Sequence, residues 1–213
     1  MKGDVIMAKM GFFKKLKNSD GFVNVFPNHK HANRTDGIGM STLSPMTLGP
    51  VEHGQEGLPN AVNLENFWQQ SKWFPCETED QFKNNRATGY QMIKPQRHKF
   101  KRGMKPTGWV WEPKNGERHV LHWVQSRQFY CNFYERLVKE NSEFIELKNM
   151  VNDGQNIQIC GYDALPDLIK ACDIEKWYLQ GVHPFGHEAV LFTMLVEPDE
   201  NKWPWRKHKT FDF

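Results

Sequence analysis

NLENFWQQSKWF, at residues 63–74, is the stretch of this sequence from which the fold prediction starts. At 3.6 residues per turn it predicts a helix with a polar stripe formed by Glu65, Gln69 and Lys72. Asn63 is a suitable N-cap, and it places Glu65 in the first turn, where the helix dipole favours an ionised carboxylate. The stripe therefore brings a carboxylate, an amide and an ammonium group to one face.

This polar stripe has two interpretations. Glu, Gln and Lys at this spacing often form a solvated helix face. The same three turns also contain Phe67, Trp68, Trp73 and Phe74, and aromatic rings on both sides are typical of a stripe that lines a concave site. We favour the second interpretation, in which the Glu65 carboxylate stabilises a developing cation, activates water or binds a sugar.

The composition indicates one globular domain. The 213 residues are 38% hydrophobic and 13% aromatic, with eight Trp, so rings rather than aliphatic runs should fill the core. A net charge of +3 argues against a polyanion held by the whole surface. The four Cys form no C-x-x-C pair, and no apolar run approaches the ~20 residues of a membrane span. We expect free thiols, no membrane contact and a cytoplasmic location.

Two basic segments are candidates for phosphate contact. Lys94–Lys105 contains six Lys or Arg residues and no acid, and Arg97 and Arg102 can grip phosphate with two hydrogen bonds each. A solvated loop is the alternative for this basic run. The tail Trp203–Lys209 interleaves aromatic and basic side chains, which can contact single-stranded nucleic acid, or it packs across the domain.

Local patterns predict helices and one hairpin. Residues 28–57 are rich in turn formers, and residues 106–121 are typical of a β-hairpin. The remaining expected elements are a helix from Glu79 capped by Thr78, helical residues 121–151 with a break at Asn141-Ser142, a strand at Ile157–Gly161, a helix from Pro166, and a helix beginning at Pro184. We predict a mainly α fold (α+β with a small β-hairpin): an arm and loop over 1–44, a single compact helical domain over 45–196, and a tail over 197–213.

The sequence gives weaker indications of a metal site or of a catalytic nucleophile than of the polar stripe. His183 and His187 are four residues apart and Glu188 follows, but the order is not H-E-x-x-H and no third ligand is signalled, so we predict no metal site. No G-x-S-x-G or nucleotide-binding glycine motif is present.

Trp123 and Arg127, also four residues apart, share a helix face.

The motif Glu-x-aromatic-aromatic-Gln-x-x-Lys, spanning Glu65 to Lys72, resembles the signature helix of the NADAR family. Its members are N-glycosidases that act on phosphorylated riboflavin precursors or ADP-ribosyl groups. The resemblance extends over roughly residues 45–196 as an order of features. These are an Arg-bearing segment (Arg86 or the basic run), a Trp at the start of a long helix (Trp123), a carboxylate after a strand (Asp163), and a last helix with His183 and Gly186.

The resemblance implies an N-glycosidase-like hydrolase for a nucleotide-like or ADP-ribosyl substrate, without a cofactor. Glu65, Lys72 and Asp163 are the predicted catalytic residues. The predicted substrate-binding residues are Trp68, Gln69, Arg97, Arg102, Trp123, Arg127, His183 and Gly186. The expected partner is a nucleotide-like small molecule or ADP-ribosylated nucleic acid. The alternatives are a non-catalytic nucleic-acid or ADP-ribose binding module and a structural or assembly protein. The sequence leaves the oligomeric state open.

Overall fold

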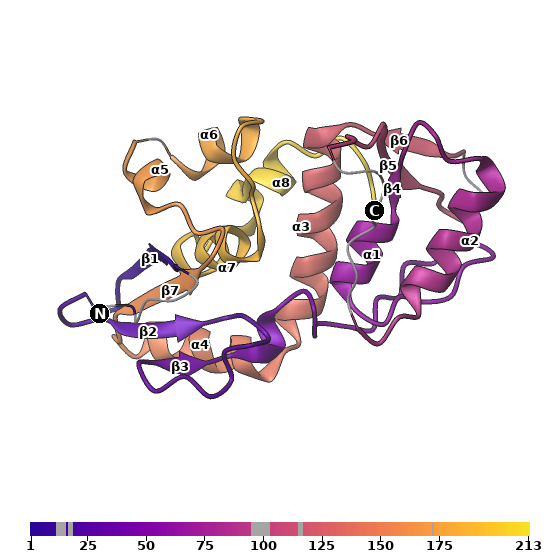
Figure 1. Ribbon diagram of the computed structural model, residues 1–213. Helices are drawn as coiled ribbons and strands as arrows, with labels where there is room; N and C mark the ends of the chain where they lie inside the picture. Colours follow the sequence, from indigo (N-terminus) through magenta and orange to yellow (C-terminus); the bar gives the residue numbers. More distant parts are fainter. Residues whose placement is uncertain (12–15, 17–18, 95–102, 115–116, 172) are drawn as a thin grey trace.

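The computed structural model describes residues 1–11, 16, 19–94, 103–114, 117–171 and 173–213. The helix α3 (Trp123–Lys139) runs through the middle of the molecule (Figure 1). On one side lies a parallel sheet with α7 (His187–Val196) against it; on the other lie α1 (Leu64–Gln70), α2 (Glu79–Tyr90) and an antiparallel sheet. In the described part of the chain, no helix combines the length and the apolar character that crossing a membrane requires.

A four-stranded parallel sheet overturns the predicted fold class. Its strands are β1 (Val5–Lys9), β2 (Val23–Phe26), β3 (Ile38–Gly39) and β7 (Ile157–Gly161), in the order β1-β7-β2-β3. The fold is therefore α+β, with a parallel and an antiparallel sheet, and the prediction of a mainly α fold was wrong. All five residues of β7 are buried, as expected for a central parallel strand. Residues 1–44, expected to form an arm and a loop, contribute three of the four strands.

The second sheet joins the predicted hairpin to the end of α1. Strands β5 (Gly108–Trp111) and β6 (His119–Leu121) pair antiparallel as expected, and β4 (Lys72–Trp73) pairs with β5. The helix α1 ends at Gln70, so Lys72 is a strand residue rather than the third member of a helical stripe. The antiparallel pairing of Lys72 with Trp109 fixes the side chains that surround the stripe.

Several helices begin where an N-cap side chain accepts a hydrogen bond from a backbone amide two or three residues later in the sequence. Asn63 accepts a hydrogen bond from the Asn66 amide at 2.8 Å and caps α1, and Thr78 forms a capping box on α2. Asn141 caps α4 at the predicted break. The helix predicted from Pro184 instead begins at His187, because Gly186 is its N-cap. The remaining helices are α4 (Ser142–Asn152), α5 (Pro166–Ala171), α6 (Ile174–Leu179), α8 (Pro204–Lys207), η1 (Ser41–Leu43) and η2 (Glu200–Lys202).

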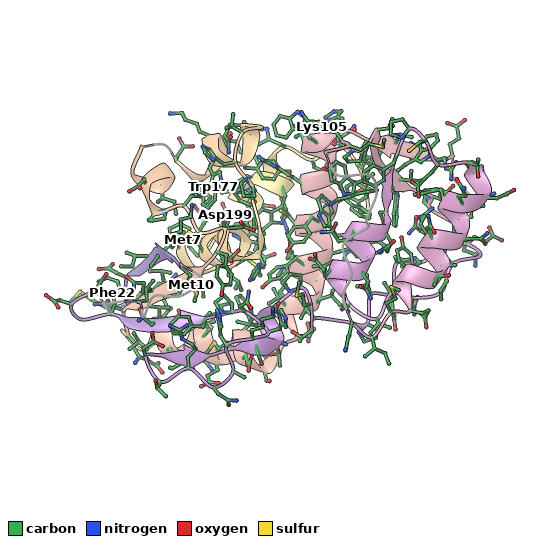
Figure 2. All side chains as sticks on the ribbon, viewed as in Figure 1. Met7, Met10, Phe22, Lys105, Trp177 and Asp199 are labelled. Atoms are coloured by element: carbon green, nitrogen blue, oxygen red, sulfur yellow. The ribbon has the colours of Figure 1, made fainter. Side chains whose placement is uncertain are left out.

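An aromatic core connects the two sides of α3. Phe67 of α1 packs against Phe129 and Phe133 of α3, with ring centroids 4.9 and 4.7 Å apart. Met7 of β1 and Trp177 of α6 belong to the same core on the side of the parallel sheet (Figure 2). The core therefore holds α1 against α3 and leaves the polar edge of α1 to be placed by its neighbours.

Candidate functional site

The three side chains of the predicted stripe form a hydrogen-bonded row, although Lys72 belongs to β4 and not to α1. Gln69 Nε2 donates to Glu65 Oε1 at 2.9 Å, and Lys72 Nζ donates to Gln69 Oε1 at 2.6 Å. Because Gln69 uses both ends of its amide, it connects the carboxylate to the ammonium group. Lys72 Nζ also lies 5.9 Å from the Trp68 ring centroid and 5.7 Å from that of Trp109, within the range of cation–π attraction.

Burial separates this row from an ordinary solvated face. Gln69 is 9% exposed, and Glu65, Trp68 and Lys72 are half-buried. Trp68 stacks on Trp109 with ring centroids 4.7 Å apart. Trp109 belongs to the hairpin β5–β6, so the residues around the stripe could not predict that Trp109 is part of the site.

Two further side chains lie near the Glu65 carboxylate. Burial lowers the pKa of His29, the charge of Lys30 lowers it further, and the charge of Glu65 opposes both. Burial raises the pKa of Tyr130 well above its usual value, with contributions from the charges of Tyr134 and Glu65. The His29 ring belongs to the loop after β2, and its Nδ1 atom is buried with no hydrogen-bond partner among the described residues. Only the tertiary structure reveals these two neighbours.

Asp163 and Gly186 form a second group. Asp163 is exposed and follows β7, and a Cβ atom placed on Gly186 would lie 3.8 Å from Asp163 Oδ2. The structure thus brings together two predicted site residues that are separated in the sequence. It adds Glu188, which is 2% exposed and lies 3.2 Å from that same Cβ position.

Trp123, Arg127 and His183 form a third group. The Arg127 guanidinium lies 4.8 Å from the Trp123 ring centroid. It donates to the backbone carbonyls of Tyr178, Gln180 and His183 at 2.5, 2.6 and 2.5 Å. These bonds hold the loop between α6 and α7, and burial lowers the pKa of Arg127. A substrate-binding role for Trp123, Arg127 and His183 stays a prediction.

Arg97 and Arg102, the two arginines predicted to bind phosphate, lie outside the described residues. Arg86, the other candidate for the Arg-bearing segment, is fully buried. It donates to Gln55 Oε1 at 2.6 Å and to the Glu112 carboxylate. Arg86 therefore supports the packing of α2 rather than facing a ligand.

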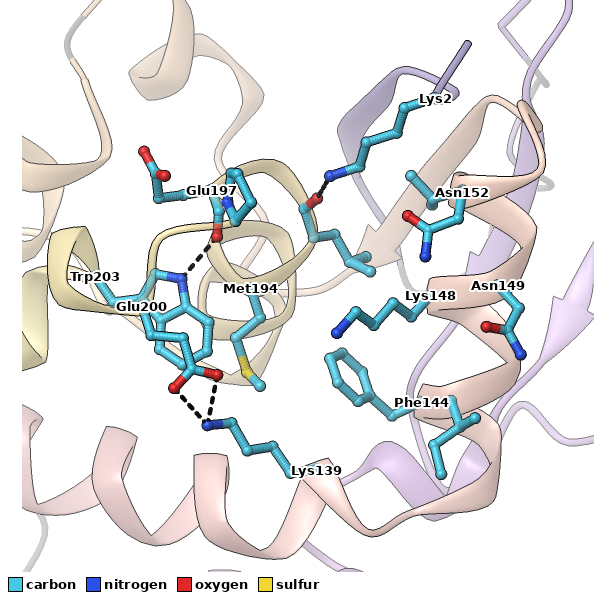
Figure 3. Close-up of a pocket in the computed structure, with 14 residues that line it drawn as sticks. Lys2, Lys139, Phe144, Lys148, Asn149, Asn152, Met194, Glu197, Glu200 and Trp203 are labelled. Carbon is cyan, nitrogen blue, oxygen red and sulfur yellow. Dashed lines mark hydrogen bonds and ion pairs between the residues drawn. The ribbon is translucent and has the colours of Figure 1, made fainter.

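A surface pocket of about 550 Å³ lies elsewhere, between α4, the end of α7 and Trp203 (Figure 3). Two of the lysines that line it already have partners within the protein: Lys2 donates a hydrogen bond to the Leu195 carbonyl at 2.6 Å, and Lys139 forms an ion pair with Glu200 at 2.8 Å. Among the predicted catalytic and substrate-binding residues that the structure describes, none lines this pocket. We base the functional proposal on the row of Glu65, Gln69 and Lys72, because it combines a carboxylate and an ammonium group with the half-buried rings of Trp68 and Trp109.

The described residues contain no group of three or more His, Cys, Asp or Glu side chains placed to hold a metal ion. Comparisons of the chain with protein-family models, with curated proteins and with solved structures gave no match. A functional proposal therefore depends on the chemistry of the residues themselves and on the motif resemblance.

Proposed function

We propose that this protein hydrolyses an N-glycosidic bond in a nucleotide-like or ADP-ribosyl substrate. The observation that carries the proposal is the half-buried row in which Gln69 connects the Glu65 carboxylate to the Lys72 ammonium group. The proposal also uses the resemblance of residues 65–72 to the NADAR signature helix.

The Glu65 carboxylate suits the reaction. Cleavage of the bond between the sugar C1′ and the base nitrogen passes through an oxocarbenium-like state. A nearby carboxylate stabilises this cation, or it takes a proton from the water that attacks C1′. The Gln69 amide orients the carboxylate through a 2.9 Å hydrogen bond. In the proposed reaction the base leaves with a proton, and the sugar gains the hydroxyl group of water.

The other groups have complementary roles. The Lys72 ammonium group holds the phosphate or the leaving base by charge. The stacked rings of Trp68 and Trp109 offer a half-buried surface on which a planar base can lie. Asp163 remains the candidate for a second catalytic carboxylate.

A binding module without catalysis is the second candidate. The C-terminal tail gives it little support, because Trp203 and Trp205 are 3% and 0% exposed and have no free face for stacking on bases. The basic run could still bind phosphate, but residues 95–102 lie outside the described residues.

The test uses the oxygen of water as a label. The protein is incubated in H₂¹⁸O with a panel of N-ribosyl 5′-phosphates and with ADP-ribosylated nucleotides, and the products are analysed by mass spectrometry. Hydrolysis predicts a free base and a sugar that carries one ¹⁸O. Retention of ligand without product would favour the binding module, and neither binding nor product would refute both functions.

A further inference from the structure

The surface pocket beside α4 combines an apolar wall with a cationic side chain (Figure 3). Phe144, Lys148 and Asn152 recur at intervals of four residues, so they share one face of α4, and all three line the pocket. Phe144 is buried, and Ile145, which also lines the pocket, is 49% exposed. The stem of Lys148 extends along this wall, and its ammonium group points into the pocket (Figure 3). One helix face therefore offers apolar surface and a positive charge to the same cavity.

The opposite wall is apolar and held in place. It is formed by Met194 and Leu195, at the end of α7, and by Trp203, and all three are buried. Trp203 Nε1 donates a hydrogen bond to the Glu197 carbonyl oxygen at 2.9 Å, which orients the indole ring (Figure 3). The volume of about 550 Å³ lies within the range of small-molecule sites. The pocket can thus take the apolar body of a small ligand between preformed walls.

The N-terminal residues border the pocket on a further side. The Gly3 amide donates to the Val151 carbonyl oxygen at 2.7 Å, and a Cβ atom on Gly3 would lie 2.1 Å from the Gln155 carbonyl oxygen. Only glycine allows this close approach to the end of α4. The preceding residue, Lys2, reaches α7, where its Nζ donates to the Leu195 carbonyl oxygen at 2.6 Å. A second ammonium group is thereby held at the pocket.

The two carboxylates that line the pocket already have partners within the protein. Glu200 pairs with Lys139 and with Arg206, at 2.8 Å in each case. Glu197 Oε1 accepts a hydrogen bond from the Asp199 amide at 2.9 Å. The acidic side chains of the pocket are thus engaged without a ligand.

Lys2 and Lys148 differ from Lys139 in this respect. Among the residues that the structure describes, no carboxylate forms an ion pair with either of them. Both border the same pocket, and the Asn149 side chain adds an amide group to its lining (Figure 3). Two ammonium groups beside buried apolar walls favour a ligand that carries a negative charge on an apolar body.

From this arrangement we infer that the pocket binds a small amphipathic carboxylate, an acid with an acyl chain or an aromatic ring as its apolar body. The carboxylate accepts a hydrogen bond from Lys148, and the charge of Lys2 adds to the attraction. The apolar body packs against Phe144, Met194 and Trp203. This site is separate from the row on α1, so the inference does not depend on the proposed function.

Calorimetric titration of the purified protein tests the ligand chemistry. Octanoate and 3-phenylpropanoate are each compared with the uncharged amide of the same acid, and acetate provides the charge without an apolar body. At least one of the two acids should bind with a dissociation constant of about 1 mM or lower. It should bind about tenfold more tightly than its amide, as expected for a charge-assisted hydrogen bond, and acetate should not bind. The acid that binds more tightly distinguishes an acyl from an aromatic ligand.

Lys148→Met tests the cation that points into the pocket. The substitution keeps an apolar side chain but removes the ammonium group, so the preference for acid over amide should fall from about tenfold to about twofold, with only Lys2 remaining. Lys83→Met is the matched control, because Lys83 is an exposed lysine of α2, on the other side of α3 (Figure 1). The control should keep the wild-type preference.

A second pair of variants tests the location without altering the core. Ile145→Glu adds a negative charge to the lining and should weaken binding of the acid about threefold relative to Ile145→Gln, which has the same size but no charge. Binding of the amide should be the same in both variants. Ile145 and Lys148 are exposed, so melting temperatures close to that of the wild type should accompany these changes.

Several results would overturn the inference. They are the absence of binding by both acids, equal affinity for acid and amide, and an unchanged preference in Lys148→Met. A dimer in analytical ultracentrifugation that Ile145→Glu dissociates, together with no binding of either acid, would instead assign the pocket to a second copy of this chain.

Discussion

His53 illustrates at the residue scale how burial fixes a protonation state next to α1. Its Nε2 lies 2.9 Å from the Pro59 carbonyl oxygen, and its Nδ1 accepts a hydrogen bond from the Gln55 amide at 3.0 Å. The ring stacks on Phe67 with centroids 5.1 Å apart. A neutral imidazole satisfies both contacts, whereas protonation of Nδ1 would break the second.

Stability should therefore fall in mild acid. Burial lowers the pKa of His53 below its ordinary value of 6.5, despite the opposing hydrogen bond to Pro59. The unfolded chain takes up a proton as the pH falls through that value, and the folded chain does not. The stabilisation that comes from the neutral His53 ring is therefore fully present above the unfolded pKa. Below the unfolded pKa, the free energy of unfolding should decrease by up to about 1.4 kcal/mol per pH unit. Urea unfolding between about pH 7.5 and 5.5 measures the slope, and His53→Gln should make it shallower. Equal slopes would contradict this account.

At the scale of elements, the short helix α1 depends on the hairpin formed by β5 and β6. Trp68 of α1 and Trp109 of β5 stack, and Lys72 of β4 lies near both rings. The antiparallel pair of Lys72 with Trp109 joins the same segments through the backbone. The hairpin therefore supports the candidate site as well as the fold.

A double-mutant cycle tests this support. Trp68→Leu, Trp109→Leu and the double variant should show a coupling free energy of about 0.5–1.5 kcal/mol, as measured for stacked aromatic pairs. Chemical denaturation gives the three differences in unfolding free energy. Additivity within about 0.3 kcal/mol would mean that the two rings do not depend on each other.

Local chemistry explains which elements the sequence could predict. Asn63 and Thr78 cap helices through bonds to amides three residues away, so neighbouring residues carry the signal. The end of α1 was missed because Ser71 and Lys72 fit a helix equally well in sequence, and only pairing with β5 draws Lys72 into a strand. The Gly186 cap of α7 was missed because Pro184 offered an equally acceptable helix start.

At the scale of the whole molecule, the parallel sheet carries the main lesson about prediction. Val5 pairs with Ile157, and Val23 pairs with the same residue from the other side. Each strand has only two to five residues, and no local pattern identifies its partner. The row of Glu65, Gln69 and Lys72 lies within one short stretch and could be predicted from it, whereas His29, Trp109 and Tyr130 become neighbours of the row only through the tertiary fold.

The C-terminal tail should contribute strongly to stability through Glu135 on α3. Burial would raise the pKa of Glu135, but bonds from Arg206, Trp205 and Lys139 outweigh it, and the pKa lies below its usual value. Trp205 Nε1 donates to Glu135 Oε2 at 2.8 Å. Glu135→Ala leaves the buried Trp205 Nε1 without its acceptor, while Arg206 and Lys139 keep Glu200, and the change should lower the unfolding free energy by about 1–3 kcal/mol. The exposed Glu140→Ala is the control in thermal and urea unfolding. A loss no larger than that of the control would contradict a tail anchored in this way.

The measurement that tests the central claim most directly compares wild type, Glu65→Gln and Glu52→Gln for N-glycoside cleavage and for stability. Glu65→Gln keeps the size of the side chain but removes its charge, so the rate should fall on the order of 10²–10⁴-fold. Its unfolding free energy should change by only about a few tenths of a kcal/mol. Glu52, which is exposed, should tolerate the same change without loss of rate. Cleavage by Glu65→Gln within about threefold of wild type, far above the rate left by loss of an acid–base group, would contradict the proposal that the Glu65 carboxylate drives the reaction.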